Sequence, residues 1–348
     1  MKNRIRIVIV IILAGLFTRC TEIAFSQKTD VSQFVRGADI GWLPQMEASG
    51  FKFLSDSGKE EDCMQILKDH GINTIRLRTW VNPSQNQSSG HCSKDETISM
   101  AERARRMGMK IMIDFHYSDS WADPGKQVKP AAWADHSFDQ LVKDVYDYTF
   151  DVMSGLKAKN IYPEWVQTGN EISNGMLLPD GSTSSFDQLV KLINSGYDAV
   201  KAVSPDTRVI IHLDEGNNNG KFRSWFDNAV KYGAKFDIIG LSYYPWWLTG
   251  HPDYSLSIDD LGNNMNDMVS RYNKDVMVVE VGGEDSQPQN TYDLLVAVIR
   301  KTKLVPEGRG LGVIYWEPEG ARSWSHYGLS AWGDNGKPTK ALNAFLVN

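Results

Sequence analysis

KIMIDFH (residues 110–116), WVQTGNE (165–171) and VMVVE (276–280) share one pattern, in which an apolar run ends in polar or charged residues. Short apolar runs of this kind predict buried strands. The longer segments between them have apolar residues at helical spacing, and strands that alternate with helices pair in parallel through crossover connections. The polar residues therefore gather at the C-terminal ends of parallel strands.

The whole chain repeats this alternation eight times. The predicted strands are residues 35–41, 74–80, 110–116, 164–171, 208–214, 238–244, 276–282 and 311–317, and predicted helices include 59–70, 94–107, 138–158, 184–203 and 258–272. Eight repeats favour an α/β fold of the (β/α)8 TIM-barrel type. An open doubly wound sheet is the alternative, but no glycine-rich nucleotide motif follows the first strand and no Gly-Lys-Ser/Thr loop occurs.

Composition and charge narrow the class of protein. The chain has 348 residues, 41% hydrophobic and 23% charged, with a net charge of −6. That balance is typical of a soluble globular enzyme and argues against a nucleic-acid partner. No linker or low-complexity tract divides the chain. We therefore expect a single catalytic domain over residues 31–348.

The N-terminus predicts export. Three basic residues precede the apolar run 7–17, which is too short to span a bilayer as a helix. Cleavage after Ser26 makes residues 1–26 a signal peptide. Cys20 offers a second outcome, a lipoprotein signal that ends before this residue and a lipid anchor through it. Either outcome places the mature protein in the periplasm, at the cell surface or outside the cell.

Two carboxylates, Glu171 and Glu280, directly follow apolar strands. Hydrolysis of a glycosidic bond needs one carboxylic acid to protonate the leaving oxygen and a second carboxylate to attack the anomeric carbon. Alternation also puts Arg76 and Arg78 on one face of their strand. Charged residues inside a barrel must be paired or used, so this set favours a functional site. Two carboxyl groups suffice for the reaction, and we expect no cofactor.

Five segments resemble, in the same order, those of glycoside hydrolase family 53, the arabinogalactan endo-β-1,4-galactanases. They are GADI (37–40), RLRTWVNP (76–83), DFHYSDSWADPG (114–125), TGNEISNGM (168–176) and YWEP (315–318). The resemblance extends from the first predicted strand to the eighth. Long ordered matches of this kind are far more specific than an isolated Asn-Glu pair.

The resemblance implies that Glu171 is the acid/base and Glu280 the nucleophile of a retaining, endo-acting enzyme that cleaves β-1,4-galactan by double displacement. It also implies roles for the surrounding residues: Asn170 binds the substrate 2-hydroxyl, Arg76 or Arg78 and Tyr243 keep the nucleophile ionised and oriented, Trp316 floors the cleavage subsite, and Asp39, His116 and Asp119 contact sugar hydroxyls.

The chain departs from the family pattern after the nucleophile. Many relatives continue Glu-Thr-Ala-Tyr-Pro, whereas residues 280–285 here read EVGGED. The acidic stretch with which some bacterial members bind calcium is also missing, so we expect no structural metal ion. Glu317 is a rival carboxylate, because it too ends a strand, but alternation turns it away from the substrate if Trp316 faces it.

Three other functions stay open at this point: hydrolysis of another β-1,4 glycan such as glucan or mannan, non-catalytic glycan binding, and metal-dependent hydrolysis. The last would need ligands such as Asp114 with His116, or His212 with Asp214. A disulfide between Cys63 and Cys92 is possible but not demanded by their spacing.

Overall fold

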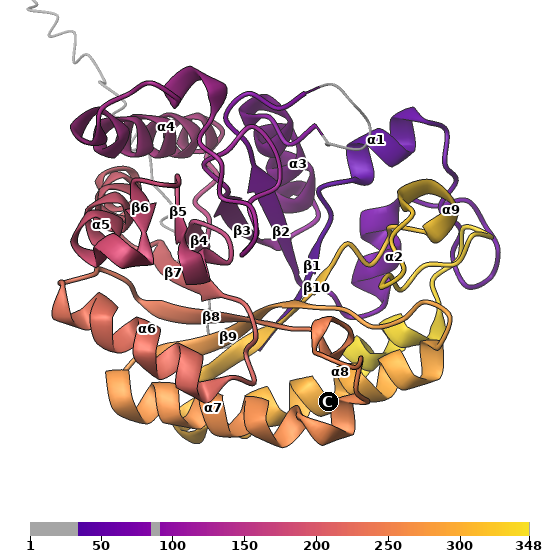
Figure 1. The fold of residues 1–348 in the computed structure, drawn as a ribbon. Coiled ribbons are helices and arrows are strands. Elements are labelled where there is room, and N and C mark those ends of the chain that lie inside the picture. Colours follow the sequence, from indigo (N-terminus) through magenta and orange to yellow (C-terminus); the bar gives the residue numbers. More distant parts are fainter. Residues whose placement is uncertain (1–33, 85–90, 348) are drawn as a thin grey trace, which may run out of the picture. The chain divides into compact units, whose positions relative to one another are not determined.

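The computed structural model describes residues 34–84 and 91–347, in which eight parallel strands close into a barrel (Figure 1). In barrel order they are β1 (Val35–Asp39), β2 (Thr74–Thr79), β3 (Lys110–Phe115), β4 (Trp165–Thr168), β7 (Arg208–Leu213), β8 (Ile238–Tyr243), β9 (Asp275–Val281) and β10 (Gly310–Trp316), which pairs with β1. The predicted TIM barrel is therefore confirmed. A short hairpin of β5 (Gly175–Met176) and β6 (Gly181–Ser182) follows β4.

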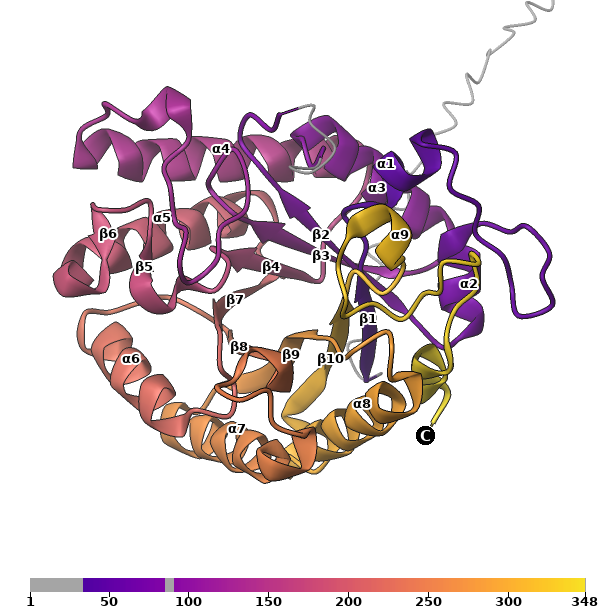
Figure 2. The same cartoon turned by 45° about the vertical axis from the view of Figure 1, so that its right-hand side comes forward.

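The helices form an outer ring around the strands (Figure 2). They are α2 (Cys63–Asp69), α3 (Lys94–Arg106), α4 (Phe138–Ala158), α5 (Phe186–Val203), α6 (Asn219–Lys231), α7 (Ile258–Tyr272) and α8 (Pro288–Lys303). Helix α2 begins at residue 63 rather than 59 because the Asp62 side chain accepts from the backbone N–H groups of Met64 and Gln65 and so caps the helix.

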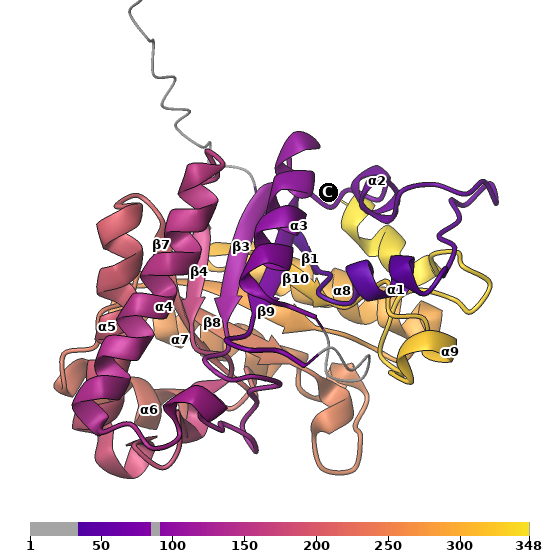
Figure 3. The same ribbon diagram turned by 90° about the horizontal axis from the view of Figure 1, so that it is seen from above.

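Two short helices lie side by side beyond the strand ends (Figure 3). These are α1 (Leu43–Ala48) and α9 (Arg322–Ser325), far apart in sequence. The indole N–H of Trp324 donates to the Ser49 hydroxyl at 2.9 Å, which joins the loops that follow β1 and β10.

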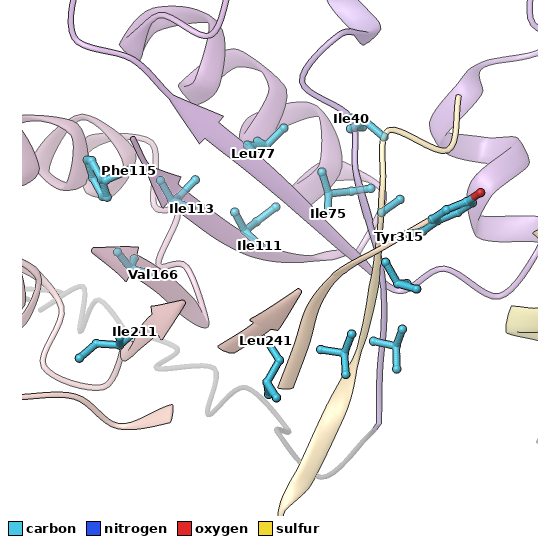
Figure 4. Packing of buried hydrophobic residues seen from close by; sticks show 14 of the residues in the cluster. Ile40, Ile75, Leu77, Ile111, Ile113, Phe115, Val166, Ile211, Leu241 and Tyr315 are labelled. Carbon is cyan, nitrogen blue, oxygen red and sulfur yellow. The ribbon is translucent and has the colours of Figure 1, made fainter. Parts of the chain in front are cut away.

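Strand alternation divides the core into two layers. Inside the barrel a small cluster contains Val35, Met112, Trp165, Ile210, Ile238, Met277, Val279 and Ile314. The larger cluster fills the space between strands and helices; Figure 4 shows members such as Ile111, Ile113 and Leu241. Because successive side chains point to opposite faces, each strand supplies both layers.

A β-bulge interrupts this alternation in β9. Leu241 of β8 pairs with Val278, but the next residue, Ser242, pairs with Glu280. Val279 is therefore an extra residue in its strand. A bulge re-aims the side chain that follows it, so Val279 packs inside the barrel and the carboxylate of Glu280 also reaches the interior.

The structure also bears on the two cysteines and on membrane insertion. Cys63 and Cys92 are free buried thiols, so the possible disulfide does not form. None of the helices described is both long and apolar enough to cross a membrane. The predicted signal sequence and Cys20 lie outside the described residues.

Candidate active site

A cavity of about 560 Å³ lies at the C-terminal ends of the barrel strands. Its lining includes His116, Trp121, Asn170, Glu171, Ser242, Tyr244, Trp247, Glu280, Trp316 and Tyr327. Both carboxylates predicted from the sequence thus share one cavity. The loops after β3, β4, β7, β8 and β10 supply most of the remaining lining, as expected for this end of a barrel.

Glu280 is held by one cation and one hydroxyl group. Its Oε1 lies 2.9 Å from a guanidinium nitrogen of Arg76, and its Oε2 accepts a hydrogen bond of 3.3 Å from the Tyr244 hydroxyl. The residue is only 6% exposed. A carboxylate with both oxygens engaged by donors has a fixed orientation, which is what a nucleophile at the bottom of a cavity needs.

Arg76 is itself fixed by the rest of the barrel interior. It donates to Asp39 at 2.6 Å, to Asp114 at 2.9 Å and to the side-chain oxygens of Gln167 at 2.7 Å and Asn170 at 3.0 Å. The side chain is fully buried, so the carboxylates compensate its charge and the two amide oxygens accept from its remaining N–H groups. Arg76 therefore serves as a rigid support for the carboxylate above it.

Glu171 reaches the cavity through a left-handed backbone. Its φ is 46°, and the preceding Gly169 has a φ of 103°. Because these angles break strand alternation, Asn170 and Glu171 both line the cavity although they are consecutive. Non-glycine residues with positive φ cluster at functional sites, where surrounding contacts hold the strain.

The two carboxyl groups have different surroundings. Burial raises the pKa of Glu171 well above its usual value, and the neighbouring charge of Glu280 raises it further. Burial also raises the pKa of Glu280, but Arg76 opposes that shift. No cation stands beside Glu171 in the described structure in the way that Arg76 stands beside Glu280. Hence Glu280 loses its proton first and Glu171 keeps its own.

Asn170 and His116 line the cavity where the sequence predicted them. Asn170 accepts from Arg76 and donates one amide hydrogen to the backbone oxygen of Ala122, which leaves its second amide hydrogen for a ligand. His116 accepts from the Ala122 N–H at one ring nitrogen and lies 3.0 Å from Asp114 at the other. Both ring nitrogens are therefore engaged by the protein itself.

Trp316 forms part of an aromatic wall. It packs edge-on against Trp42, Trp121 and Tyr327 at ring-centre distances of 5.1, 5.7 and 4.9 Å. A half-buried ring fixed in this way offers an apolar face to a sugar. The next residue, Glu317, is fully buried and pairs with Arg78, as alternation predicted.

Besides Arg76, four of the residues predicted for the site do not line the cavity: Asp39, Arg78, Asp119 and Tyr243. Tyr243 points outward, since alternation places it with Leu241 in the outer layer, and its hydroxyl bonds to Tyr254 and Ser257. Tyr244, one residue later, takes the role predicted for Tyr243. Arg78 pairs with Asp39 and Glu317, and in the described structure it forms no ion pair with Glu280.

Asp39 and Asp119 are likewise corrected. Asp39 is fully buried between Arg76 and Arg78 and does not line the cavity, so it supports the arginines rather than contacting sugar hydroxyls. Asp119 accepts from the backbone N–H groups of Asn82 and Ala131 and so ties two loops together.

The sequence did not identify four residues of the site: three contact the carboxylates or their supports, and a fourth lines the cavity. Tyr244 and Ser242 lie on the inward face of the predicted strand 238–244, and alternation could have identified them. His212 was considered only as a metal ligand, whereas it bonds to Ser242 at 2.7 Å. Tyr327 lines the cavity from a loop after β10 and carries no sequence signal.

The cavity is acidic. Five carboxyl groups line it (Asp123, Glu171, Asp214, Glu215 and Glu280), and no lysine or arginine is among its described lining residues. Lys221 pairs with Asp214 from outside the lining at 2.6 Å. Within residues 34–84 and 91–347, no group of three or more His, Cys, Asp or Glu side chains is arranged to hold a metal ion.

Comparison with known proteins places this geometry in a family. The profile of glycosyl hydrolase family 53 matches residues 35–345. An arabinogalactan endo-beta-1,4-galactanase of Thermothelomyces thermophilus is 33% identical over 313 residues, which cover 84% of this chain and 90% of the relative.

Two solved structures agree over the same length. A fungal beta-1,4-galactanase is 30% identical with a TM-score of 0.81 and coverage of 90% of this chain and 99% of the other. The GH53 catalytic domain of Ignisphaera aggregans is also 30% identical, with a TM-score of 0.80 and coverage of 90% and 95%. The chain therefore belongs to glycosyl hydrolase family 53.

Proposed function

We propose that this chain is an endo-acting, retaining hydrolase that cleaves β-1,4-galactosidic bonds in galactan and arabinogalactan. The observation that carries the proposal is the unequal environment of two carboxyl groups in one cavity. Glu280 is bound by Arg76 and Tyr244, whereas Glu171 is buried without a cation beside it. One group is thereby suited to attack and the other to donate a proton.

The reaction follows from these environments. Ionised Glu280 attacks the anomeric carbon while protonated Glu171 gives its proton to the departing glycosidic oxygen. Once Glu280 is esterified its negative charge is gone, so the pKa of Glu171 falls and the group can act as a base. It then deprotonates the water that releases the sugar, and the anomeric configuration is retained.

The cavity also supports a role for its other side chains. The amide hydrogen of Asn170 that has no protein partner can bind the substrate 2-hydroxyl. Trp316 lines the same cavity as the two carboxyl groups, and its ring can stack on a sugar bound there. The galactan substrate itself is inferred from relatives that are named galactanases, and this chain matches them over 90% and 99% of their length.

Product release from β-1,4-galactan, β-glucan and mannan tests the proposal. We expect the wild-type protein to cleave galactan selectively and the Glu171→Ala and Glu280→Ala variants to lose this activity. Glu284→Ala is the matched control, because this carboxylate follows Glu280 by four residues but does not line the cavity. Cleavage of glucan or mannan instead would keep the mechanism and change the substrate; activity that survives in Glu280→Ala would remove the site assignment.

We also propose that the chain is exported. Support comes from the basic and apolar N-terminal sequence alone. Mass spectrometry of the mature N-terminus distinguishes the two processing outcomes: a free Gln27 means ordinary signal cleavage, and a lipid-modified Cys20 means a membrane anchor. Retention of an intact Met1 in the cytoplasm would contradict export.

A further inference from the structure

A buried hydrogen-bond chain joins Glu171 to His212 through Ser242. The Ser242 hydroxyl donates to Glu171 Oε1 at 2.6 Å, and His212 Nε2 lies 2.7 Å from the same hydroxyl. Ser242 is 1% exposed and His212 is fully buried. The two residues come from adjacent strands, β8 and β7, so the barrel scaffold fixes their separation.

The direction of each hydrogen bond follows from the neighbours of His212. Burial, together with the charge of Arg76, lowers the pKa of His212 well below its usual value, so the ring is neutral and carries one N–H. Gln167 accepts from Arg76 with its side-chain oxygen and therefore turns its amide nitrogen toward His212 Nδ1, at 3.0 Å.

A second donor points at the same ring nitrogen. The backbone N–H of Glu171 lies 3.4 Å from Nδ1, and only the side-chain oxygen of Asn170, at 2.9 Å, favours the opposite tautomer. Two donors thus face Nδ1 and the proton belongs on Nε2. His212 then donates to Ser242, and the single hydroxyl hydrogen of Ser242 is left to point at Glu171.

The direction of these hydrogen bonds decides which oxygen of Glu171 carries the proton. Oε1 of Glu171 accepts from Ser242, while Oε2 takes no hydrogen bond from any described residue and belongs to a side chain that lines the cavity. The transferable proton is therefore left on the oxygen that meets the glycosidic bond. A hydrogen bond donated to a carboxyl group also favours its charged form.

We propose that Ser242, oriented by His212, is a positioning residue that sets the orientation and the proton affinity of Glu171. The inference rests on the proposed function for its meaning in catalysis, but the effect on the carboxyl group is a property of the protein alone. Ser242 opposes the burial that keeps Glu171 protonated, so that the group remains able to ionise in the second half of the reaction.

Other charged groups face Glu171 and must be taken into account. Glu280 comes from β9, Asp214 from the end of β7 and Asp123 from the loop after β3, and each raises the pKa of Glu171. Lys221 of α6 neutralises part of the charge of Asp214. These groups are unchanged by substitution of Ser242, so a shift in the variant reports the loss of the hydroxyl.

The test is a titration of Glu171 by NMR in the full chain labelled with ¹³C at the glutamate side-chain carbonyl, with the signal assigned by its loss in Glu171→Gln. Ser242→Ala should raise the pKa of Glu171 by about one unit, the effect of losing a hydrogen bond to a charged group. Ser242→Thr keeps the hydroxyl and should restore the wild-type value, while Ser242→Cys, a weak donor, should lie between them.

The pH dependence of activity is an independent second test. Because Glu171 stays protonated to higher pH when the donor is lost, the alkaline limb of kcat/KM on β-1,4-galactan should move up by about one pH unit in Ser242→Ala. An unchanged NMR pKa in a folded Ser242→Ala protein would overturn the inference. Absence of galactan cleavage by the wild type would overturn the proposed function and leave the NMR result to decide the inference.

Discussion

Two adjacent tyrosines provide a sharp test of the nucleophile's environment. Tyr244 donates to Glu280 at 3.3 Å, whereas the Tyr243 hydroxyl bonds to Tyr254 and Ser257 outside the barrel. Replacement of each by phenylalanine removes one oxygen atom from neighbouring positions. Only Tyr244→Phe removes a donor from the carboxylate that attacks the substrate.

The size of the effect follows from the geometry. A hydrogen bond to a charged group contributes about 1.5 to 3 kcal/mol, and 3.3 Å exceeds the best O–H···O distance of about 2.8 Å, so the lower end applies. About 1.5 kcal/mol corresponds to roughly one pKa unit. Because the lost bond stabilised the ionised form, the pKa of Glu280 rises. At a pH below that pKa, the fraction of ionised Glu280 in the variant, and with it the rate, is about tenfold lower than in the wild type.

The assay is the pH dependence of kcat/KM on galactan, whose acid limb reports the free enzyme. We expect the acid limb of Tyr244→Phe to move up by about one pH unit. Tyr243→Phe should lose roughly 1 to 2 kcal/mol of stability through its two hydrogen bonds and keep the wild-type limb. A shifted limb in Tyr243→Phe with an unchanged one in Tyr244→Phe would refute the reasoning.

The other predictions are simpler. Glu280→Gln should abolish hydrolysis while calorimetry still detects binding of galacto-oligosaccharides; lost binding would argue against a purely chemical role. Arg76→Met should lower the free energy of unfolding by about 3 to 5 kcal/mol, because buried carboxylates lose their partner, and an unchanged melting temperature would contradict this. Activity should persist in a chelator, and its loss would indicate a required metal ion. Cys63 and Cys92 should react with a thiol reagent only after unfolding, since both are buried and burial raises the pKa of the Cys92 thiol to about 12; rapid labelling of the folded protein would refute their burial.

Local patterning predicted most of the fold. Most barrel strands are short runs rich in apolar residues, and each strand lies within three residues of its predicted limits. Alternation also identified Arg76 correctly as an interior residue, because β2 is regular. Such features depend on residues close together in the chain, which is why the sequence alone reveals them.

The finer parts of the site depend on irregular geometry or on distant contacts. Counting in twos from Met277 turns Glu280 outward, and only the bulge at Val279 brings it inside. The contact between Ser242 and Glu171 depends on the stagger of β4 and β8, which are separated by β7 in the barrel. No local pattern in either strand encodes that stagger. The role that the family resemblance implied for Tyr243 belongs to Tyr244, because Tyr243 faces the outer layer and Tyr244 faces the cavity.

The acidic lining of the cavity bears on which polymers can enter it. A sugar acid brings a negative charge, and two like charges about 5 Å apart repel by on the order of 3 kcal/mol at the effective dielectric of a protein surface. Lys221 pairs with Asp214 and Glu215, Arg76 pairs with Glu280, and Glu171 holds its proton, so Asp123 is the lining carboxyl group without an ion pair among the described residues. We therefore expect polymers of neutral sugars to bind in preference to uronic-acid polymers, whose own negative charge would meet this carboxylate.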